Sequence, residues 1–259
     1  MIKSAYIALN DSRFNYSYKG FCSIVCEIIS IALEHYSTYG NFNVIVEDKQ
    51  VLEFFDCINK NFKLNYYDAG PWYLEKFFSN TRIHKNYNAH ILANIDDLKL
   101  RNKILISTLN IKTKYVYQFD KMYNQLGIDD KTLGLQIRGT DKKEEIPEID
   151  ISNVMKRVDE YLNFGFVDKI FLCTDDKKYL DILLEKYDKI LIYDKTLAIS
   201  DNSQSLHHHA LDRRKINEEV LSSVYLLSKC KYFLYSFSNV SFLALIMGIH
   251  NFKKIDNIN

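Results

Sequence analysis

The stretch that decides the fold class is Phe171-Leu172-Cys173-Thr174-Asp175-Asp176, followed at once by Lys177–Lys186. An apolar run of strand length ends in three polar residues. The next segment then has apolar residues at helical spacing, with Leu180, Leu183 and Leu184 on one side. This order is typical of a buried strand followed by an amphipathic helix, the unit from which parallel sheets are built.

The same alternation continues on both sides of this unit. We expect strands and helices, in chain order, over Leu133–Ile137, Ile151–Leu162, Lys169–Cys173, Lys177–Lys186, Ile190–Tyr193, Arg214–Lys229, Tyr232–Tyr235 and Phe242–Met247. Strands that alternate with helices in this way predict a parallel sheet with helices on both faces. The second half of the chain is therefore predicted to be an α/β domain.

The first half of the chain is less regular. Ala5–Leu9 and Asn43–Val46 have the composition of strands, and a helix is expected between them over about 21–36. The stretch Asp120–Lys131 is polar and contains Gly127, which suggests a domain boundary near residues 118–130. We therefore predict two α/β domains, residues 1–125 and 126–259.

The composition excludes several classes of protein. The 259 residues are 47% hydrophobic and 26% charged, enough to build a core, and the net charge of +1 argues against nucleic acid as a partner. The odd cysteine count of five does not predict a disulfide framework or a metal site.

No signal peptide and no membrane span are expected. We expect a cytoplasmic protein whose contact with membranes, if any, is peripheral.

The first candidate site follows the predicted strand Leu133–Ile137, within the segment Gly134–Lys142 (GLQIRGTDK). In parallel sheets the ligand lies beyond the carboxyl ends of the strands. There the planar guanidinium of Arg138 could hold a diphosphate in a two-point grip, and Gly139 would let a ligand approach closely. Asp141 could orient Arg138 or Lys142. The alternative interpretation is a charged β-turn.

Two further polar segments end predicted strands. Thr174-Asp175-Asp176 could bind a phosphorylated ligand, and the alternative is an N-cap for the next helix. Ser236–Ser241 could bind an anion at a helix start, with capping again as the alternative. Three adjacent histidines, His207–His209, are interpreted as a loop near these candidate sites, with His208 as a ligand contact. A metal site is the other possibility for them.

Together these segments resemble the fucosyltransferase-like glycosyltransferases, which include the α-1,6-fucosyltransferases and the nodulation fucosyltransferases. The closest likeness is to bacterial relatives with a His-Tyr-Arg-Gly-Thr-Asp-Lys type motif, which matches Gln136–Lys142. The other matching segments are Gly20–Ser23, Trp72–Phe78, Thr174–Asp176, Glu218–Leu221, Leu226–Cys230 and Ser238–Ser241. The resemblance covers most of the chain and is specific after about residue 133.

The resemblance implies an α/β fold of the GT-B type, with two facing Rossmann-like domains and parallel sheets. It implies inverting, metal-independent transfer from a nucleotide sugar such as GDP-fucose to a glycan or lipid-linked oligosaccharide, with no cofactor. Arg138 would bind the diphosphate, Lys142 would help to stabilise it as it leaves, and Glu145, or failing that Glu144, would be the general base. The donor-binding residues would be Gln136, Arg138, Gly139, Asp141, Thr174, Asp175, Asp176, His208, Ser223, Ser236, Ser238, Asn239 and Val240.

Two departures from the family pattern concern the base of the nucleotide. Gln136 replaces a histidine and Ser223 replaces an aspartate, and in the relatives these two positions read guanine. Serine cannot accept from both N1–H and the N2 amine of guanine, as a carboxylate can. Two alternatives to a GDP-dependent transferase therefore stand: a nucleotide-sugar-binding protein without catalysis, and a transferase that uses a different nucleotide sugar.

Overall fold

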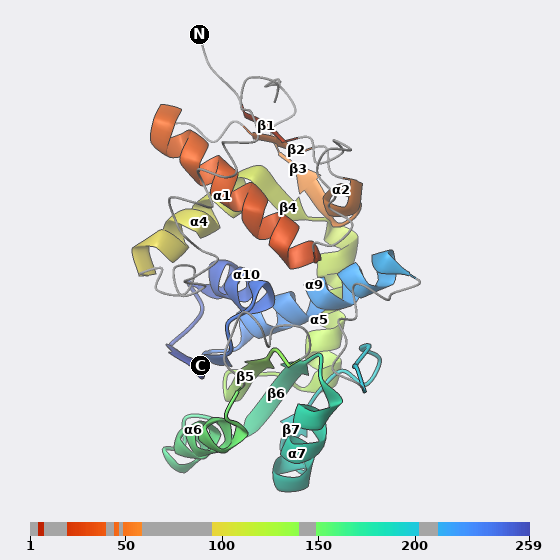
Figure 1. Ribbon diagram of the computed structural model, residues 1–259, viewed down its shortest axis with the longest axis vertical. Helices are drawn as coiled ribbons and strands as arrows, with labels where there is room; N and C mark the ends of the chain where they lie inside the picture. The colour runs from red at the N-terminus through yellow and green to blue at the C-terminus, as the bar shows by residue number, and fades with distance from the viewer. Residues whose placement is uncertain are drawn as a thin grey trace. The chain divides into compact units, whose positions relative to one another are not determined.

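The structure is a computed structural model, and it describes residues 5–7, 20–39, 44–46, 49–58, 95–139, 149–201 and 212–259. The chain divides into two compact units, Met1–Val116 and Tyr117–Asn259. The division falls within helix α5 (Thr113–Leu126) (Figure 1). Much of the polar stretch that suggested a domain boundary is therefore helical. Its polar residues lie on a helix that also buries Phe119 completely.

The first unit contains short strands and three described helices. Parallel strands β1 and β2 pair with each other, and antiparallel strands β3 and β4 form a second pair. The prediction of parallel sheets therefore fails for β3 and β4, which extend directly from helices α2 and α4 and run in opposite directions. The elements are β1 (Ala5–Ile7), α1 (Phe21–Tyr39), β2 (Val44–Val46), α2 (Lys49–Phe54), β3 (Phe55–Cys57), α4 (Ile95–Thr108) and β4 (Leu109–Ile111).

The core of the first unit forms around α1. Ile24, Val25 and Ile28 of this helix are fully buried. The ring of Phe21 packs edge-on against Phe54, with centroids 5.3 Å apart. The predicted aromatic segment Trp72–Phe78 lies outside the described residues.

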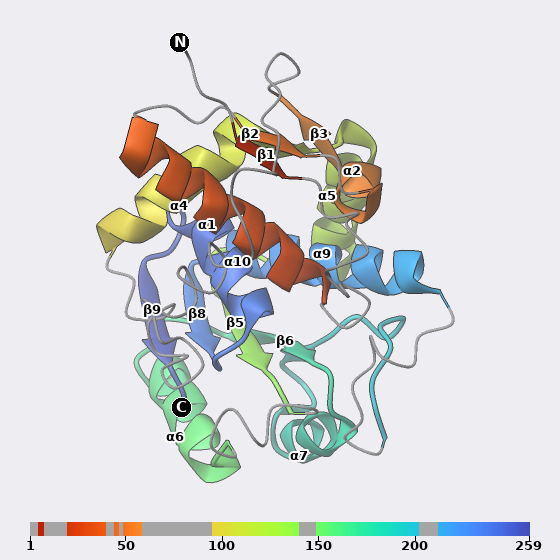
Figure 2. The same cartoon turned by 45° about the horizontal axis from the view of Figure 1, so that its top comes forward.

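The second unit is built on a parallel five-stranded sheet of order β7-β6-β5-β8-β9 (Figure 2). Strand β5 leads by way of α6 to β6 and then by way of α7 to β7, all on one side. The chain then passes through α9 to β8 and through α10 to β9, on the other side of β5. The elements are β5 (Thr132–Ile137), α6 (Ile151–Asn163), β6 (Lys169–Thr174), α7 (Lys177–Tyr187), β7 (Leu191–Ile192), α9 (Arg213–Lys229), β8 (Tyr232–Tyr235), α10 (Asn239–Gly248) and β9 (Lys254–Asn257).

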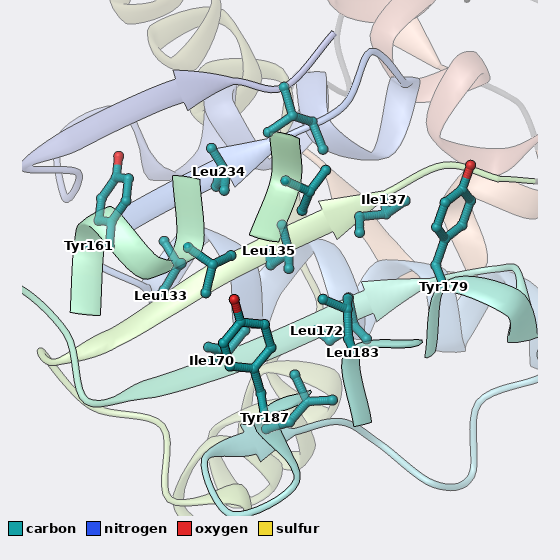
Figure 3. Close-up of a cluster of buried hydrophobic side chains, with 14 of the residues drawn as sticks. Leu133, Leu135, Ile137, Tyr161, Ile170, Leu172, Tyr179, Leu183, Tyr187 and Leu234 are labelled. Atoms are coloured by element: carbon teal, nitrogen blue, oxygen red, sulfur yellow. The ribbon is translucent and has the colours of Figure 1, made fainter. Parts of the chain in front are cut away.

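Helices α6 and α7 cover one face of this sheet. The strand side chains on that face alternate along the sequence, as a period of two requires, and they pack against aliphatic and tyrosine side chains from the two helices (Figure 3). The labelled members of this cluster are Leu133, Leu135, Ile137, Tyr161, Ile170, Leu172, Tyr179, Leu183, Tyr187 and Leu234. The helices expected on this face are confirmed to within one residue at each end.

Helix α9 approaches the opposite face of the sheet at a glycine. A Cβ atom on Gly134 would lie 3.2 Å from Cβ and Sγ of Cys230 and from a methyl carbon of Leu227. Such contacts are tighter than ordinary packing, so the missing side chain lets α9 lie close to β5. Gln136, two residues further along, therefore also faces the side of the sheet that α9 and α10 cover.

Candidate functional site

The three polar segments predicted to form a site come together at the carboxyl edge of this sheet. Ile137 of β5 pairs with Thr174 of β6, and Gln136 pairs with Tyr235 of β8. The residues that follow these strands are therefore neighbours. From β5 the chain proceeds to β6 and β7 on one side of β5, whereas β8 and β9 lie on the other side. The carboxyl end of β5 is therefore the topological switch point of the sheet, where ligands of open α/β folds bind.

Arg138 is held by a carboxylate from the neighbouring strand end. Its Nη1 lies 2.5 Å from Oδ2 of Asp175, and the two side chains are 17% and 14% exposed. The other carboxylate oxygen, Oδ1, accepts a hydrogen bond of 2.8 Å from the backbone N–H of Gly139. Asp175 thus fixes both the guanidinium group and the turn that carries it.

Gly139 lies where a side chain would not fit. A Cβ atom there would lie 2.5 Å from Cβ of Asp176 and 2.7 Å from a ring carbon of Tyr179. The close approach explains the glycine after Arg138 without reference to a ligand. It also brings the start of α7 against the turn that follows β5.

Asp176 and Ser238 are the N-caps of α7 and α10. Asp176 accepts from the backbone N–H of Lys178 at 2.9 Å, and Thr174 Oγ1 accepts from the backbone N–H of Asp176 at 3.3 Å. Ser238 Oγ accepts from the backbone N–H of Ser241 at 3.0 Å. The capping alternative is therefore confirmed for both residues. Capping does not prevent the open N–H groups of a helix start from binding an anion.

Gln136 is buried beneath the start of α10. Its side chain, with 4% exposure, accepts at Oε1 from the hydroxyls of Ser236 at 2.9 Å and Ser241 at 2.6 Å, and Ser238 Oγ is 3.2 Å away. The hydroxyl of Ser236 also accepts from the backbone N–H of Arg138 at 2.8 Å. Ser241 was absent from the predicted donor-binding residues, although it ends the matching segment Ser238–Ser241.

Ser223 lies in α9, facing β6. It is 7% exposed, and its hydroxyl donates to the backbone oxygen of Glu219 at 3.0 Å. It also hydrogen bonds to the thiol of Cys173. Burial raises the pKa of that thiol to about 12, although the hydrogen bond from Ser223 acts to lower it. The carboxylate of Glu219 accepts from the backbone N–H of Ala198 at 3.2 Å. Glu219 belongs to the matching segment Glu218–Leu221, but no role was predicted for it.

The remaining predicted site residues lie outside the described part of the chain. These are Asp141, Lys142, Glu144 and Glu145 after the turn, and His208 in the segment before α9. Their predicted roles stay predictions. Within residues 5–7, 20–39, 44–46, 49–58, 95–139, 149–201 and 212–259, no group of three or more His, Cys, Asp or Glu side chains is arranged to hold a metal ion.

All five cysteines are free thiols. Among the helices that the structure describes, none combines the length and the apolar character needed to cross a membrane.

No protein-family model matches the chain, and no curated protein matches its sequence. In structure it is similar to the NodZ α-1,6-fucosyltransferase co-crystallised with GDP, at 14% identity over 91% of this chain and 90% of that chain, with a TM-score of 0.53. It is similar to the same enzyme soaked with GDP-fucose, at 12% identity over 88% and 89%, with a TM-score of 0.51. It is also similar to a variant of Arabidopsis thaliana FUT1 in complex with GDP, at 12% identity over 98% and 69%, with a TM-score of 0.57.

The chain has a fucosyltransferase-like fold. The predicted resemblance and the α/β fold class are thereby confirmed. The facing arrangement of the two domains stays a prediction. At 12 to 14% identity the likeness concerns the fold, and the chemistry has to be argued from the site.

Proposed function

We propose that the chain is a glycosyltransferase that takes its sugar from a nucleoside diphosphate sugar, GDP-fucose or a similar GDP-sugar, and transfers it to a glycan acceptor. The observation that supports this most directly is the meeting of Arg138 with the start of α10 at the β5–β8 switch point. A guanidinium group and an open helix N-terminus are complementary to a diphosphate. The structural neighbours with GDP or GDP-fucose support the choice of nucleotide.

The proposed reaction is an inverting displacement without a metal ion. An acceptor hydroxyl attacks the anomeric carbon of the donor, the bond from that carbon to the phosphate oxygen breaks, and the bonding electrons leave with GDP. The acceptor's proton passes to a general base, for which the family resemblance suggests Glu145 or Glu144. Arg138 and Lys142 would stabilise the negative charge that develops on the diphosphate, which is the task a metal ion performs in other transferases.

Asp175 has a defined part in this proposal. A carboxylate repels a diphosphate, so it is a poor direct contact for the donor. It is well placed to hold the planar guanidinium of Arg138 in one orientation before the donor arrives. Preorganised charge of this kind costs less to align during the reaction than a freely rotating side chain.

Calorimetry with GDP, UDP and ADP, followed by a transfer assay with GDP-fucose, tests the proposal. We expect binding of GDP, a loss of at least tenfold in affinity for Arg138→Ala, and no transfer by that variant. Arg157→Ala is the matched control, because it breaks a similar pair, with Asp256 at 2.9 Å, on β9, two strands away from β5. Wild-type affinity in Arg138→Ala would overturn the site.

The same measurements test the two alternative functions. Binding of GDP without transfer to any glycan acceptor favours a nucleotide-sugar-binding protein. Preference for UDP or ADP favours a transferase with another donor. The acceptor class, a glycan or a lipid-linked oligosaccharide, is part of the proposal and is tested by offering both.

A further inference from the structure

The hydroxyl groups around Gln136 fix which end of its amide faces them. Ser236 Oγ already accepts from the backbone N–H of Arg138, and Ser238 Oγ accepts from the backbone N–H of Ser241. Each of these hydroxyls carries one proton and, with a lone pair already used by a backbone N–H, can donate that proton to the amide oxygen. The contact of 2.6 Å between Ser241 Oγ and the amide is also shorter than an N–H···O bond and typical of an O–H···O bond.

The protons can be distributed so that every group in the cluster is satisfied. Ser236 and Ser241 donate to the two lone pairs of Gln136 Oε1, and Ser238 donates to Ser241 Oγ at 3.2 Å. The amide oxygen is then saturated. The network joins the end of β5 to the first turn of α10.

The amide nitrogen of Gln136 points away from this saturated oxygen. Within the described residues, Nε2 of Gln136 donates no hydrogen bond. The unpartnered side-chain atoms that are fully buried in that part of the chain are Thr108 Oγ1 and Arg157 Nε, so the Gln136 nitrogen retains contact with solvent. A side chain that is otherwise buried thus keeps two N–H groups without a partner among the described residues.

The first turn of α10, whose Ser241 holds the Gln136 amide oxygen, offers a second open donor. This helix has 10 residues, and its N-cap Ser238 satisfies the backbone N–H of Ser241, while the N–H of Phe242 donates to the Ser238 carbonyl oxygen. The backbone N–H of Val240 donates to no atom of the described residues. An open N–H at a helix N-terminus attracts anions.

We propose that Gln136 positions a phosphate group of the donor and does not read its base. Its oxygen, fixed by Ser236 and Ser241, would aim Nε2 at a phosphate bound on the first turn of α10, together with the N–H of Val240. The proposal rests on the function proposed above, because it assigns a second set of phosphate donors opposite Arg138. It also assigns Gln136 to the phosphate, whereas the histidine at this position of the family pattern reads the base.

The test separates the two ends of the amide. Gln136→Glu keeps an oxygen that accepts from the serine hydroxyls, but it also buries a carboxylate, so we expect some loss in the thermal midpoint, which is measured alongside binding. It replaces the Nε2 donor with an oxygen that repels phosphate. We expect its affinity for inorganic pyrophosphate to fall by roughly tenfold or more, with the affinity for guanosine unchanged, in calorimetric titrations. Gln136→Met removes both ends and should lose stability as well as pyrophosphate binding.

Asn251→Asp is the matched control. It makes the same amide-to-carboxyl change at the amino edge of the sheet, where the Asn251 amide donates to three backbone oxygens at the end of α9. It should lose stability but bind pyrophosphate as the wild type does.

Three outcomes would overturn the proposal. Wild-type affinity for pyrophosphate in Gln136→Glu, with Gln136→Met destabilised, would make Gln136 a structural residue alone. Loss of guanosine binding with pyrophosphate binding retained would make it a reader of the base. If the wild type binds GDP but no pyrophosphate, the phosphate site is wrong while the nucleotide function stands. Failure of the wild type to bind any nucleoside diphosphate would instead overturn the proposed function itself.

Discussion

Asp175 and Arg138 form an ion pair between the carboxyl ends of β5 and β6, with Oδ2 and Nη1 2.5 Å apart. The same carboxylate accepts from the N–H of Gly139 through its other oxygen. The pair therefore has two separable components, an ion pair and a backbone hydrogen bond.

Replacing Asp175 in two ways separates these components. Asp175→Asn loses the ion pair but keeps an oxygen for the Gly139 N–H, so we expect it to lower the free energy of unfolding by about 1 kcal/mol. Asp175→Ala loses both and should cost about 2–3 kcal/mol. Urea denaturation of the two variants measures the difference. Equal losses would mean that the backbone hydrogen bond contributes nothing.

Gly139→Ala should destabilise the second unit by about 1–3 kcal/mol, because the new methyl group would overlap Asp176 and Tyr179. Gly134→Ala is the control, since its new contacts of 3.2 Å demand a smaller adjustment. Thermal unfolding should rank Gly139→Ala below Gly134→Ala. The reverse order would show that the turn after β5 moves more easily than α9 does.

The sequence predicted the second unit well because its signals are local. Apolar runs that end in polar residues located β5, β6 and β8, and the rule for parallel sheets placed Arg138 and Ser236 at one edge. Strand β9, Lys254–Asn257, was missed because an edge strand with alternating polar residues lacks an apolar run. Helix α5 was not predicted, because its many polar residues hide a single buried face around Phe119.

The details of the site depended on tertiary contacts that no local pattern encodes. The residue that holds Arg138 comes from another strand, 37 positions away by the difference of 175 and 138. Gln136 and its serine partners are separated by about one hundred residues in the sequence. The sequence placed these residues near each other but could not say that Gln136 Oε1 would face the hydroxyls.

The base preference can be tested at two adjacent serines of α9. Ser222 and Ser223 are both buried, and both hydroxyls donate to the backbone oxygen of Glu219, at 2.8 and 3.0 Å. A carboxylate at either position should cost stability, because it is buried without a cationic partner in the described contacts. We expect Ser223→Asp alone to raise the affinity for GDP relative to UDP, measured by competition binding. An equal change in Ser222→Asp would show that position 223 has no special relation to guanine.

Asp256 gives the second unit an acid-sensitive contact. Burial acts to raise the pKa of Asp256, but hydrogen bonds from Tyr161, Lys254 and Arg157 outweigh it and lower the pKa below the usual value. Such a group stabilises the folded state above its unfolded pKa of about 3.9, and this contribution is lost as the pH falls through the lower folded pKa. We expect Asp256→Asn to lower the thermal midpoint at pH 7 and to differ little from the wild type near pH 2.

Asp168→Asn is the control for that comparison. Asp168 is 54% exposed and 4.0 Å from its lysine partner, so its replacement should change stability by less than about 0.5 kcal/mol. A midpoint difference between the wild type and Asp256→Asn that stays constant from pH 7 to pH 2 would contradict the assignment.

Removal of divalent ions should leave transfer intact. The proposed mechanism relies on Arg138 and Lys142 for the charge of the leaving diphosphate, and the adjacent carboxylates Asp175 and Asp176 have separate tasks, one on Arg138 and one at the start of α7. Initial rates with GDP-fucose, measured with and without EDTA, provide the test. Loss of turnover in EDTA and its recovery with manganese would contradict the metal-free mechanism.

The strand order has a consequence for how the site comes into being during folding. Strands β5, β6 and β7 follow one another along the chain and can pair through short loop closures, whereas β8 must return to β5 across roughly one hundred residues, which is the slower kind of contact to form. The pairing of β5 with β8 is therefore expected to form late in folding. A nascent chain contains Arg138 long before it contains Ser236 and Ser241. Ligand affinity should therefore appear abruptly when β8 pairs with β5, and should not increase gradually as the chain lengthens.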